Sequence, residues 1–499
     1  MESILRFNSK IADKKIGLSF FPFIVSLASF CLNILFVFNP MFSYINVGVQ
    51  ALLLLLLFLS KKYGDFLGLY MVFLASSMEF GYFLGTENFY GFKNIRIAGL
   101  NLGLLVIVPL FIVALINFKS ITSYLRGKRS VNNTLLAWLF FCLIAFLVGF
   151  VGIIINDNNI AQLPNVYVSF LKEAYMWFAF PLMVAVCALF VASYSKYGIS
   201  KLKEYLLILI VCFLISVPFS YLFGERGFYG NVKTLIISNI YFLCPLFLLV
   251  PLFLNLRLKI LYYALCFAAL AFILLYNANG KIILLLALVF LYYLIFAWKL
   301  LKTITARIVF VIILVFSLVA GVFIISRVYS TNFLLQNKIE QTFSLIAFWK
   351  EDWLENMGVS PRYRIYELIN TFSEYLHKPY YVFFGKGFLG TMKDYNNYFG
   401  TVYTEGGFSE AEWSIMSFYS VHETFNGVLL IGGLFGLFMY ISVFWTFIKN
   451  SRKSLFLIIG SVWFLLLYGY SMTISVFGII AFIIGLLDLK KNNRPFFKH

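Results

Sequence analysis

Residues 308–326 of the chain form an unbroken apolar run, IVFVIILVFSLVAGVFIIS, and residues 327–421 after it are comparatively polar. A helix needs about 20 apolar residues to cross roughly 30 Å of hydrocarbon. A second long apolar segment, 423–447, begins almost directly after the polar stretch. This pattern predicts a membrane protein in which one large polar loop connects two membrane-spanning helices.

The composition places the whole chain in the membrane class. Of its 499 residues, 62% are hydrophobic and 12% are charged, whereas a soluble domain is nearer half apolar and a quarter charged. Apolar runs of spanning length are found near 16–38, 44–60, 63–85, 97–117, 134–155, 175–195, 204–223, 235–255, 259–277, 281–298, 308–326, 423–447, 455–471 and 473–488. The predicted fold is an all-α integral membrane protein of about fourteen transmembrane helices. Helices 1–11 occupy residues 1–326, the large and partly helical outer loop is 327–421, and 422–499 hold helices 12–14 and a cytoplasmic tail.

The basic residues predict the orientation of these helices. Lys and Arg are retained on the cytoplasmic side of short loops. If the amino end is inside, 25 of the 39 Lys and Arg residues lie in inner segments, six lie in short outer loops, and eight lie in 327–421. Both termini are therefore expected in the cytoplasm. The net charge of +18 is attributed to this inner collar and its contact with membrane lipids, and no nucleic-acid partner is expected.

The outer loop carries a helical pattern of its own. From Pro361, with Ser360 as a candidate cap, apolar residues recur at helical spacing at Ile365, Leu368, Ile369, Phe372 and Leu376. Lys378-Pro379 stops the pattern. An amphipathic helix is expected there, against the membrane-facing part of the protein. Its first turn contains Arg362 and Arg364, which the helix dipole does not favour at that end; snorkelling or surface pairing is the alternative to a functional role.

Four motifs follow one another on the predicted outer face. They are RGFYGN at 226–231, NGK at 279–281, SPRYR at 360–364 with Pro379 and GKGF at 385–388, and HETFN at 422–426 running on to Gly433 and Gly436. Each motif alone is weak, but their order and shared side are more specific. Over about residues 200–445 the chain resembles the bacterial O-antigen polymerase and ligase family, with Lys281 where the family usually has an arginine.

The resemblance implies an enzyme of the bacterial cytoplasmic (inner) membrane. It would polymerise undecaprenyl-diphosphate-linked oligosaccharide repeat units on the outer face, by metal-independent glycosyl transfer to an acceptor sugar hydroxyl. Its partners would be the lipid-linked donor and acceptor glycans, with a chain-length regulator and a flippase. A ligase that transfers glycan to lipid A core or another acceptor is the first alternative, although its members are typically shorter. A lipid-linked oligosaccharide flippase is the second, but it should have short outer loops.

Basic residues suit the leaving group of this reaction, a membrane-anchored pyrophosphate on which negative charge builds. Preorganised cations stabilise such charge. The resemblance assigns Arg226, Lys281 and one of Arg362 or Arg364 to the pyrophosphate or glycan.

A histidine suits the other half of the reaction, because the acceptor hydroxyl must lose a proton near neutral pH. Among the three histidines, His499 is terminal and His377 lies at the end of the loop helix, where a structural or surface role is expected. His422 is the candidate base, although a lone histidine at the start of a helix is usually a cap or an interfacial contact. Glu423 is a candidate to orient it or to serve as the base itself, although neighbours on a helix do not share a face, whereas Asn426, four residues on, does. Glu423 and Asn426 are also candidate substrate-binding residues. No His or Cys cluster has ligand spacing, so neither a metal nor a cofactor is expected.

Overall fold

The computed structural model describes residues 19–35, 41–76, 129–175, 198–223, 259–276, 303–329, 353–355, 357–400, 408–421 and 424–450, with single positions and short pieces between them. Within these residues the chain is mostly helical. Two short strands, β1 (Arg96–Ile97) and β2 (Leu100–Asn101), pair antiparallel with Arg96 opposite Asn101. The predicted span 97–117 therefore begins in a hairpin, because polar residues still interrupt the apolar run there. The chain divides into two compact units.

Four described segments are long and apolar enough to cross a membrane. They are Met41–Leu59, Leu136–Ile154, Lys203–Leu222 and Phe425–Ser442. They coincide with the spans predicted at 44–60, 134–155, 204–223 and 423–447, so the membrane class is supported by length and composition. The predicted spans that lie wholly or mostly outside the described residues are 175–195, 235–255, 281–298, 455–471 and 473–488.

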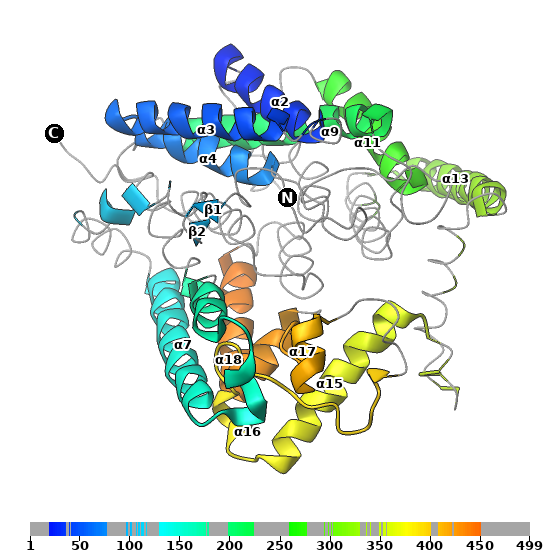
Figure 1. Cartoon of the computed structure of the whole chain (residues 1–499). Coiled ribbons are helices and arrows are strands. Elements are labelled where there is room, and N and C mark those ends of the chain that lie inside the picture. Colours follow the sequence, from blue (N-terminus) through cyan, green and yellow to red (C-terminus); the bar gives the residue numbers. More distant parts are fainter. Residues whose placement is uncertain are drawn as a thin grey trace. The chain divides into compact units, whose positions relative to one another are not determined.

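The first unit is a helical assembly with polar side chains between its helices. It contains α2 (Phe20–Leu35), α3 (Met41–Leu59), α4 (Tyr63–Ser76), α9 (Gly198–Phe223), α11 (Lys259–Tyr276) and α13 (Ile304–Tyr329), and α2, α3 and α4 lie side by side (Figure 1). The Asn33 amide donates to the Ser76 carbonyl at 2.8 Å, and Asn46 donates to Asn33 Oδ1 at 3.0 Å. Such interhelical hydrogen bonds stabilise packing where lipid offers no polar partner.

Charged contacts bring the amino ends of three helices of this unit together. Ser19 N, before α2, donates to Glu204 Oε1 at 3.0 Å. Asp65 in α4 pairs with Lys201 of α9 at 3.2 Å and accepts from Tyr205 OH at 2.8 Å. The predicted topology starts all three helices on the same, inner side of the membrane. The contacts between their amino ends are consistent with that prediction.

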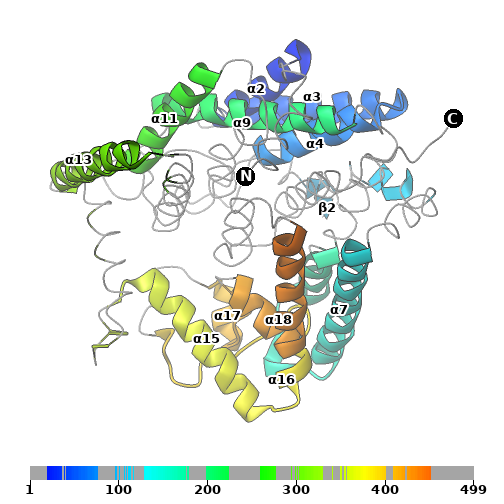
Figure 2. The ribbon, with the colours of Figure 1, turned by 180° about the vertical axis from the view of Figure 1, so that it is seen from behind.

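The second unit combines membrane-type helices with the folded part of the predicted outer loop. It contains α7 (Arg129–Ile154), the short helix η1 (Asp157–Gln162), a helix over 166–175, α15 (Val359–His377), α16 (Tyr381–Phe384), α17 (Glu410–Ile415) and α18 (Thr424–Asn450). Helix α18 lies beside α7, and α15 and α16 pack on α18 (Figures 1 and 2). One core cluster unites Tyr363, Tyr366, Met392, Phe399, Phe408, Phe418 and Leu430. The described part of the loop is thus a packed layer with an aromatic core.

Helix α15 confirms the predicted loop helix but begins two residues earlier, at Val359, with Gly358 as its cap. Pro361 lies in the first turn, where its missing N–H costs nothing. The helix ends at His377, before Lys378-Pro379, as predicted. Its buried side is mixed. Glu367, Asn370, Thr371 and Glu374 are all 0% exposed, while Leu368 and Ile369 of the predicted apolar stripe pack against core clusters that contain tyrosines of α15.

Candidate functional site

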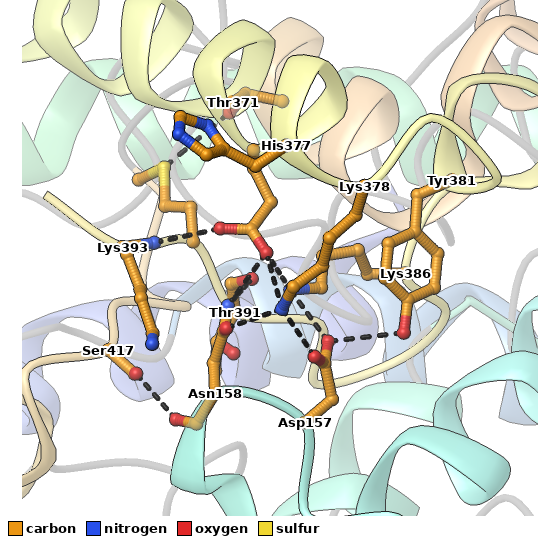
Figure 3. Close-up of polar contacts among 12 residues, drawn as sticks. Asp157, Asn158, Thr371, His377, Lys378, Tyr381, Lys386, Thr391, Lys393 and Ser417 are labelled. Atoms are coloured by element: carbon orange, nitrogen blue, oxygen red, sulfur yellow. Dashed lines mark hydrogen bonds and ion pairs between the residues drawn. The ribbon is translucent and has the colours of Figure 1, made fainter. Parts of the chain in front are cut away.

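Two carboxylates and two lysines meet where the loop joins the C-terminal end of α7 (Figure 3). Lys386 Nζ lies 2.7 Å from Asp157 Oδ2 and 2.6 Å from Glu374 Oε1. Lys378 Nζ lies 2.5 Å from Asp157 Oδ1 and 3.0 Å from Glu374 Oε1. These four residues are called the charge cluster, and their formal charges cancel.

Neutral groups saturate the remaining polar atoms of the charge cluster. Asn158 donates to Glu374 Oε1 at 3.0 Å and accepts from Lys378 at 2.7 Å. Tyr395 OH donates to Glu374 Oε2 at 3.0 Å, while Tyr381 OH donates to Asp157 at 3.1 Å. A buried ion pair is tolerated when such additional hydrogen bonds accompany good geometry.

The electrostatics of the charge cluster favour its ionised state. Burial acts to raise the pKa of Glu374, but the charge of Lys386 and several hydrogen bonds outweigh it, so that pKa lies below its ordinary value. The pKa of Asp157 is lowered by the same balance. Burial acts to lower the pKa of Lys378, yet its hydrogen bonds to Asp157 and Glu374 raise it to about 12. Burial lowers the pKa of Lys386, against the pull of the two carboxylates. The charge cluster, neutral overall, therefore fixes the loop to the end of α7, and this connection is called the lock.

The GKGF motif inserts its backbone against α18. Lys386 N donates to the Leu430 carbonyl at 2.8 Å, and Gly387 N donates to the Ile431 carbonyl at 2.9 Å. These carbonyls can accept from outside the helix because α18 breaks at Gly433, whose φ of 57° and ψ of −151° are not helical. At the break, these two α18 carbonyls accept hydrogen bonds from loop amides in place of amides of their own helix.

The same segment touches α7 on its other side. Phe388 N donates to the Ala145 carbonyl at 2.9 Å. Gly387 has φ +73°, and a Cβ there would lie 2.0 Å from Gly149 N. A Cβ on Gly149 would lie 2.3 Å from the Phe388 carbonyl oxygen. Glycine at both positions therefore permits backbone-to-backbone contact, which explains the Gly-x-Gly pattern in this chain.

A third carboxyl lies at the base of the insertion. Glu173, on helix 166–175, accepts a hydrogen bond from Leu389 N. The Glu173 residue is partly buried. Burial raises the pKa of Glu173 to about 7, against the effect of the hydrogen bond from Leu389. This carboxyl therefore titrates near neutral pH beside the inserted segment.

Two of the sequence-predicted site residues meet in the structure. Asn426 Nδ2, at the start of α18, donates to the Arg364 carbonyl at 2.8 Å and to Glu367 Oε2 at 3.2 Å. Arg362 instead turns back on the chain before α15, where Nη2 and Nε donate to the Met357 carbonyl at 2.6 and 3.2 Å. The first turn of α15 is thus tied to the start of α18, and Arg362 has a structural role there.

The other predicted site residues lie outside the described part of the chain. They are Arg226, Lys281, His422 and Glu423. Helix α18 begins at Thr424, directly after the last two. Arg362, Arg364 and Asn426 are the predicted site residues that the structure describes, and the contact between the last two is through the Arg364 backbone carbonyl.

Two acids of the loop, Asp394 and Glu412, bind backbone amides in its turns. Asp394 accepts from Phe399 N at 2.7 Å, and Glu412 closes a capping box with Ser409 and accepts from Tyr419 N at 2.9 Å. Within the described residues, no three His, Cys, Asp or Glu side chains form a group suited to a metal ion.

Sequence reasoning did not foresee the charge cluster. One signal was present, since Glu374 and Lys378 are four residues apart on a helix, and Lys386 stands between two glycines. Asp157 carries no local signal beyond its position after a predicted span. In comparisons with known proteins, no family model matches this chain, and neither does any curated protein.

Proposed function

We propose that this chain is a membrane-embedded glycosyltransferase that polymerises undecaprenyl-diphosphate-linked oligosaccharide repeat units at the outer face of the bacterial cytoplasmic membrane. The observation that carries the proposal is the hydrogen bond from Asn426 to the Arg364 carbonyl. It joins two of the four motifs, separated by 62 residues in the chain. Motifs that form one site must lie together, and these two do.

In the proposed reaction, cations bind the pyrophosphate of the donor and a base accepts the proton of the acceptor hydroxyl. Arg226, Lys281 and Arg364 are the proposed cations. Arg364 is preferred to Arg362 because its backbone carbonyl accepts a hydrogen bond from Asn426 of the HETFN motif. His422, at the start of α18, is the proposed base, and Glu423 is proposed to orient it. Such a base contributes typically ~10²- to 10⁴-fold in rate.

The packed loop supports an enzyme over a flippase. A flippase needs helices that alternate around an inner cavity, whereas here the loop is fixed to α7 and α18 through the charge cluster and the inserted GKGF segment. A ligase would use the same arrangement with lipid A core as acceptor, so only the acceptor separates the two enzymes. A chain-length regulator and a flippase are the expected partners, and both termini are proposed to lie in the cytoplasm.

The test compares His422→Ala with His377→Ala in cells that lack the chromosomal copy. His377 is a matched control because its ring is exposed and stacks on Tyr395 with centroids 4.2 Å apart. We expect His422→Ala to accumulate single repeats on the acceptor, at normal protein level, while His377→Ala makes long chains. Chains of normal length from His422→Ala would refute the assignment of the base.

The deletion strain separates the three functions. Single repeats on the acceptor indicate a lost polymerase, polymer left on undecaprenyl diphosphate indicates a lost ligase, and unflipped units inside the cell indicate a lost flippase. The purified protein should also elongate lipid-linked repeats in excess chelator, and Arg364→Ala should slow it. Activity that returns only with Mg²⁺ or Mn²⁺ would contradict the metal-independent mechanism.

A further inference from the structure

Large apolar side chains are exposed along one side of α15 and α16. They are Phe372, Leu376, Tyr380, Phe383 and Phe384, called here the apolar face. Leu376 is 81% exposed and Phe383 is 65% exposed. A group of exposed apolar side chains of this size indicates a surface that contacts something other than water.

The opposite side of α15 is buried, and it carries polar side chains beside the core residues Tyr363, Tyr366 and Tyr375. Glu367 and Glu374 are fully buried, as are Asn370 and Thr371 between them. A helix between a protein core and water has the reverse arrangement, with its apolar stripe inward and its charges outward. Outward apolar and inward polar side chains are expected of a helix that separates protein from lipid, where every polar group must find its partner within the protein.

The apolar face is continuous with helices that are long and apolar enough to span a membrane. The Phe384 ring packs on Phe435 of α18, with centroids 5.8 Å apart. Leu434 and Phe438, also on α18, are themselves exposed. A Cβ on Gly433 would lie 2.5 Å from the Val382 carbonyl oxygen, so α16 lies directly on the helix at its break.

The position of the inserted segment along α7 also indicates that this part of the loop lies at membrane depth. Phe388 N bonds to the Ala145 carbonyl, near the middle of the candidate span Leu136–Ile154. At a rise of 1.5 Å per residue, Ala145 lies roughly 13 Å along the helix from Ile154. Non-helical backbone at membrane depth must be enclosed by protein, and residues 385–390 are all buried.

We propose that the apolar face of α15 and α16 contacts the acyl chains of the outer leaflet of the bilayer. The part of the loop that carries it is then immersed at the membrane interface, and only its remainder projects into water. Lys378, partly buried just after α15, would lie at headgroup level, as amphipathic side chains do at membrane interfaces. The proposal rests on the two candidate spans and is independent of the polymerase reaction.

The test is site-directed spin labelling of the full-length chain in phospholipid nanodiscs. A single cysteine, in a background without the native cysteines, is placed at Leu376 or Phe383. Matched controls are Phe438, exposed on α18, and Asn397, exposed in a polar turn. The measurement is the collision rate of each label with oxygen, which partitions into lipid, and with a water-soluble nickel complex.

We expect the labels at Leu376 and Phe383 to collide with oxygen as often as the label at Phe438, and to be shielded from nickel. Nickel accessibility equal to that at Asn397 would place the face in water and overturn the proposal. Shielding from both reagents would also overturn it, because another segment of this chain or a second copy would then cover the face.

A second measurement needs no substitution. The wild-type chain is reconstituted with a phospholipid that bears a photoactivatable group on its acyl chain, and the adducts are mapped by mass spectrometry. Adducts within 372–384 at a level like that around Phe438 are expected. Adducts around Phe438 with none in 372–384 would contradict lipid contact even if the labelled variants misfolded.

Discussion

Lys386→Met is the sharpest perturbation of the charge cluster. It replaces the buried ammonium by an apolar group of similar length and leaves two carboxylates with Lys378 alone. Removal of one partner from a buried ion pair costs about 3–5 kcal/mol. Lys378 Nζ stays within 2.5 and 3.0 Å of Asp157 and Glu374, so we expect the lower value, about 3 kcal/mol.

The cost should appear as local opening of the inserted segment. The amides of Lys386, Gly387 and Phe388 are bonded to carbonyls of α18 and α7, so their hydrogen exchange reports that opening. A loss of about 3 kcal/mol corresponds to roughly 10²-fold faster exchange. The assay is hydrogen–deuterium exchange with mass spectrometry on the full chain in nanodiscs.

Two further variants make the result decisive. Lys393→Met is the matched control, because the Lys393 side chain is exposed and outside the charge cluster, and it should exchange like wild type. The double variant Lys386→Met with Glu374→Gln removes one charge of each sign and should recover part of the protection. Wild-type exchange in Lys386→Met, or no recovery in the double variant, would refute the electrostatic account of the lock.

Two other expectations follow from the same region. Gly149→Ala should speed hydrogen exchange in the inserted segment, because its Cβ would lie 2.3 Å from the Phe388 carbonyl oxygen and overpacking costs about 1–3 kcal/mol. Gly152→Ala is the control, since a Cβ there meets nothing within 4 Å, and it should be neutral or slightly stabilising. Equal effects of the two substitutions would contradict the close contact at Gly149. Glu173 has a folded pKa of about 7, above its unfolded value of about 4.3, so the unfolded chain releases the proton first. The wild-type Tm should therefore fall as pH rises from about 5 to about 7 and then level off, and a slope that persists unchanged in Glu173→Gln would remove Glu173 as its cause.

The elements that the sequence predicted well depend on local chemistry. The stop of α15 at His377 follows from Lys378-Pro379, since proline cannot continue a helix. The start of α18 at Thr424 lies within one residue of the predicted span, because polarity changes abruptly there. The polar and apolar faces of α15 were likewise visible as a periodic pattern. Which of those faces meets the protein was not, because the pattern alone does not say which solvent surrounds the helix.

The parts that could not be predicted depend on distant residues. Gly387 is recognisable as a turn residue, but its fit against Gly149 needs a partner on a helix more than two hundred positions earlier. Asn158 donates to Glu374 across 216 positions, and no spacing rule connects them. Arg362 and Arg364 were equivalent candidates in sequence, and the contact that distinguishes them is the hydrogen bond from Asn426 to the Arg364 carbonyl.

The lock between the loop and α7 has a consequence for the synthesis of the chain. Ser417 donates to the Asn158 carbonyl, 259 positions before it. At 5–20 residues per second, the ribosome needs roughly 10–50 s to make that length. Asp157, just after α7, lacks both of its lysines until Lys378 is made, 221 positions later. Insertion of the GKGF segment must also wait for the carbonyls of α18, so the outer loop can complete its fold only after the helix that follows it has been made.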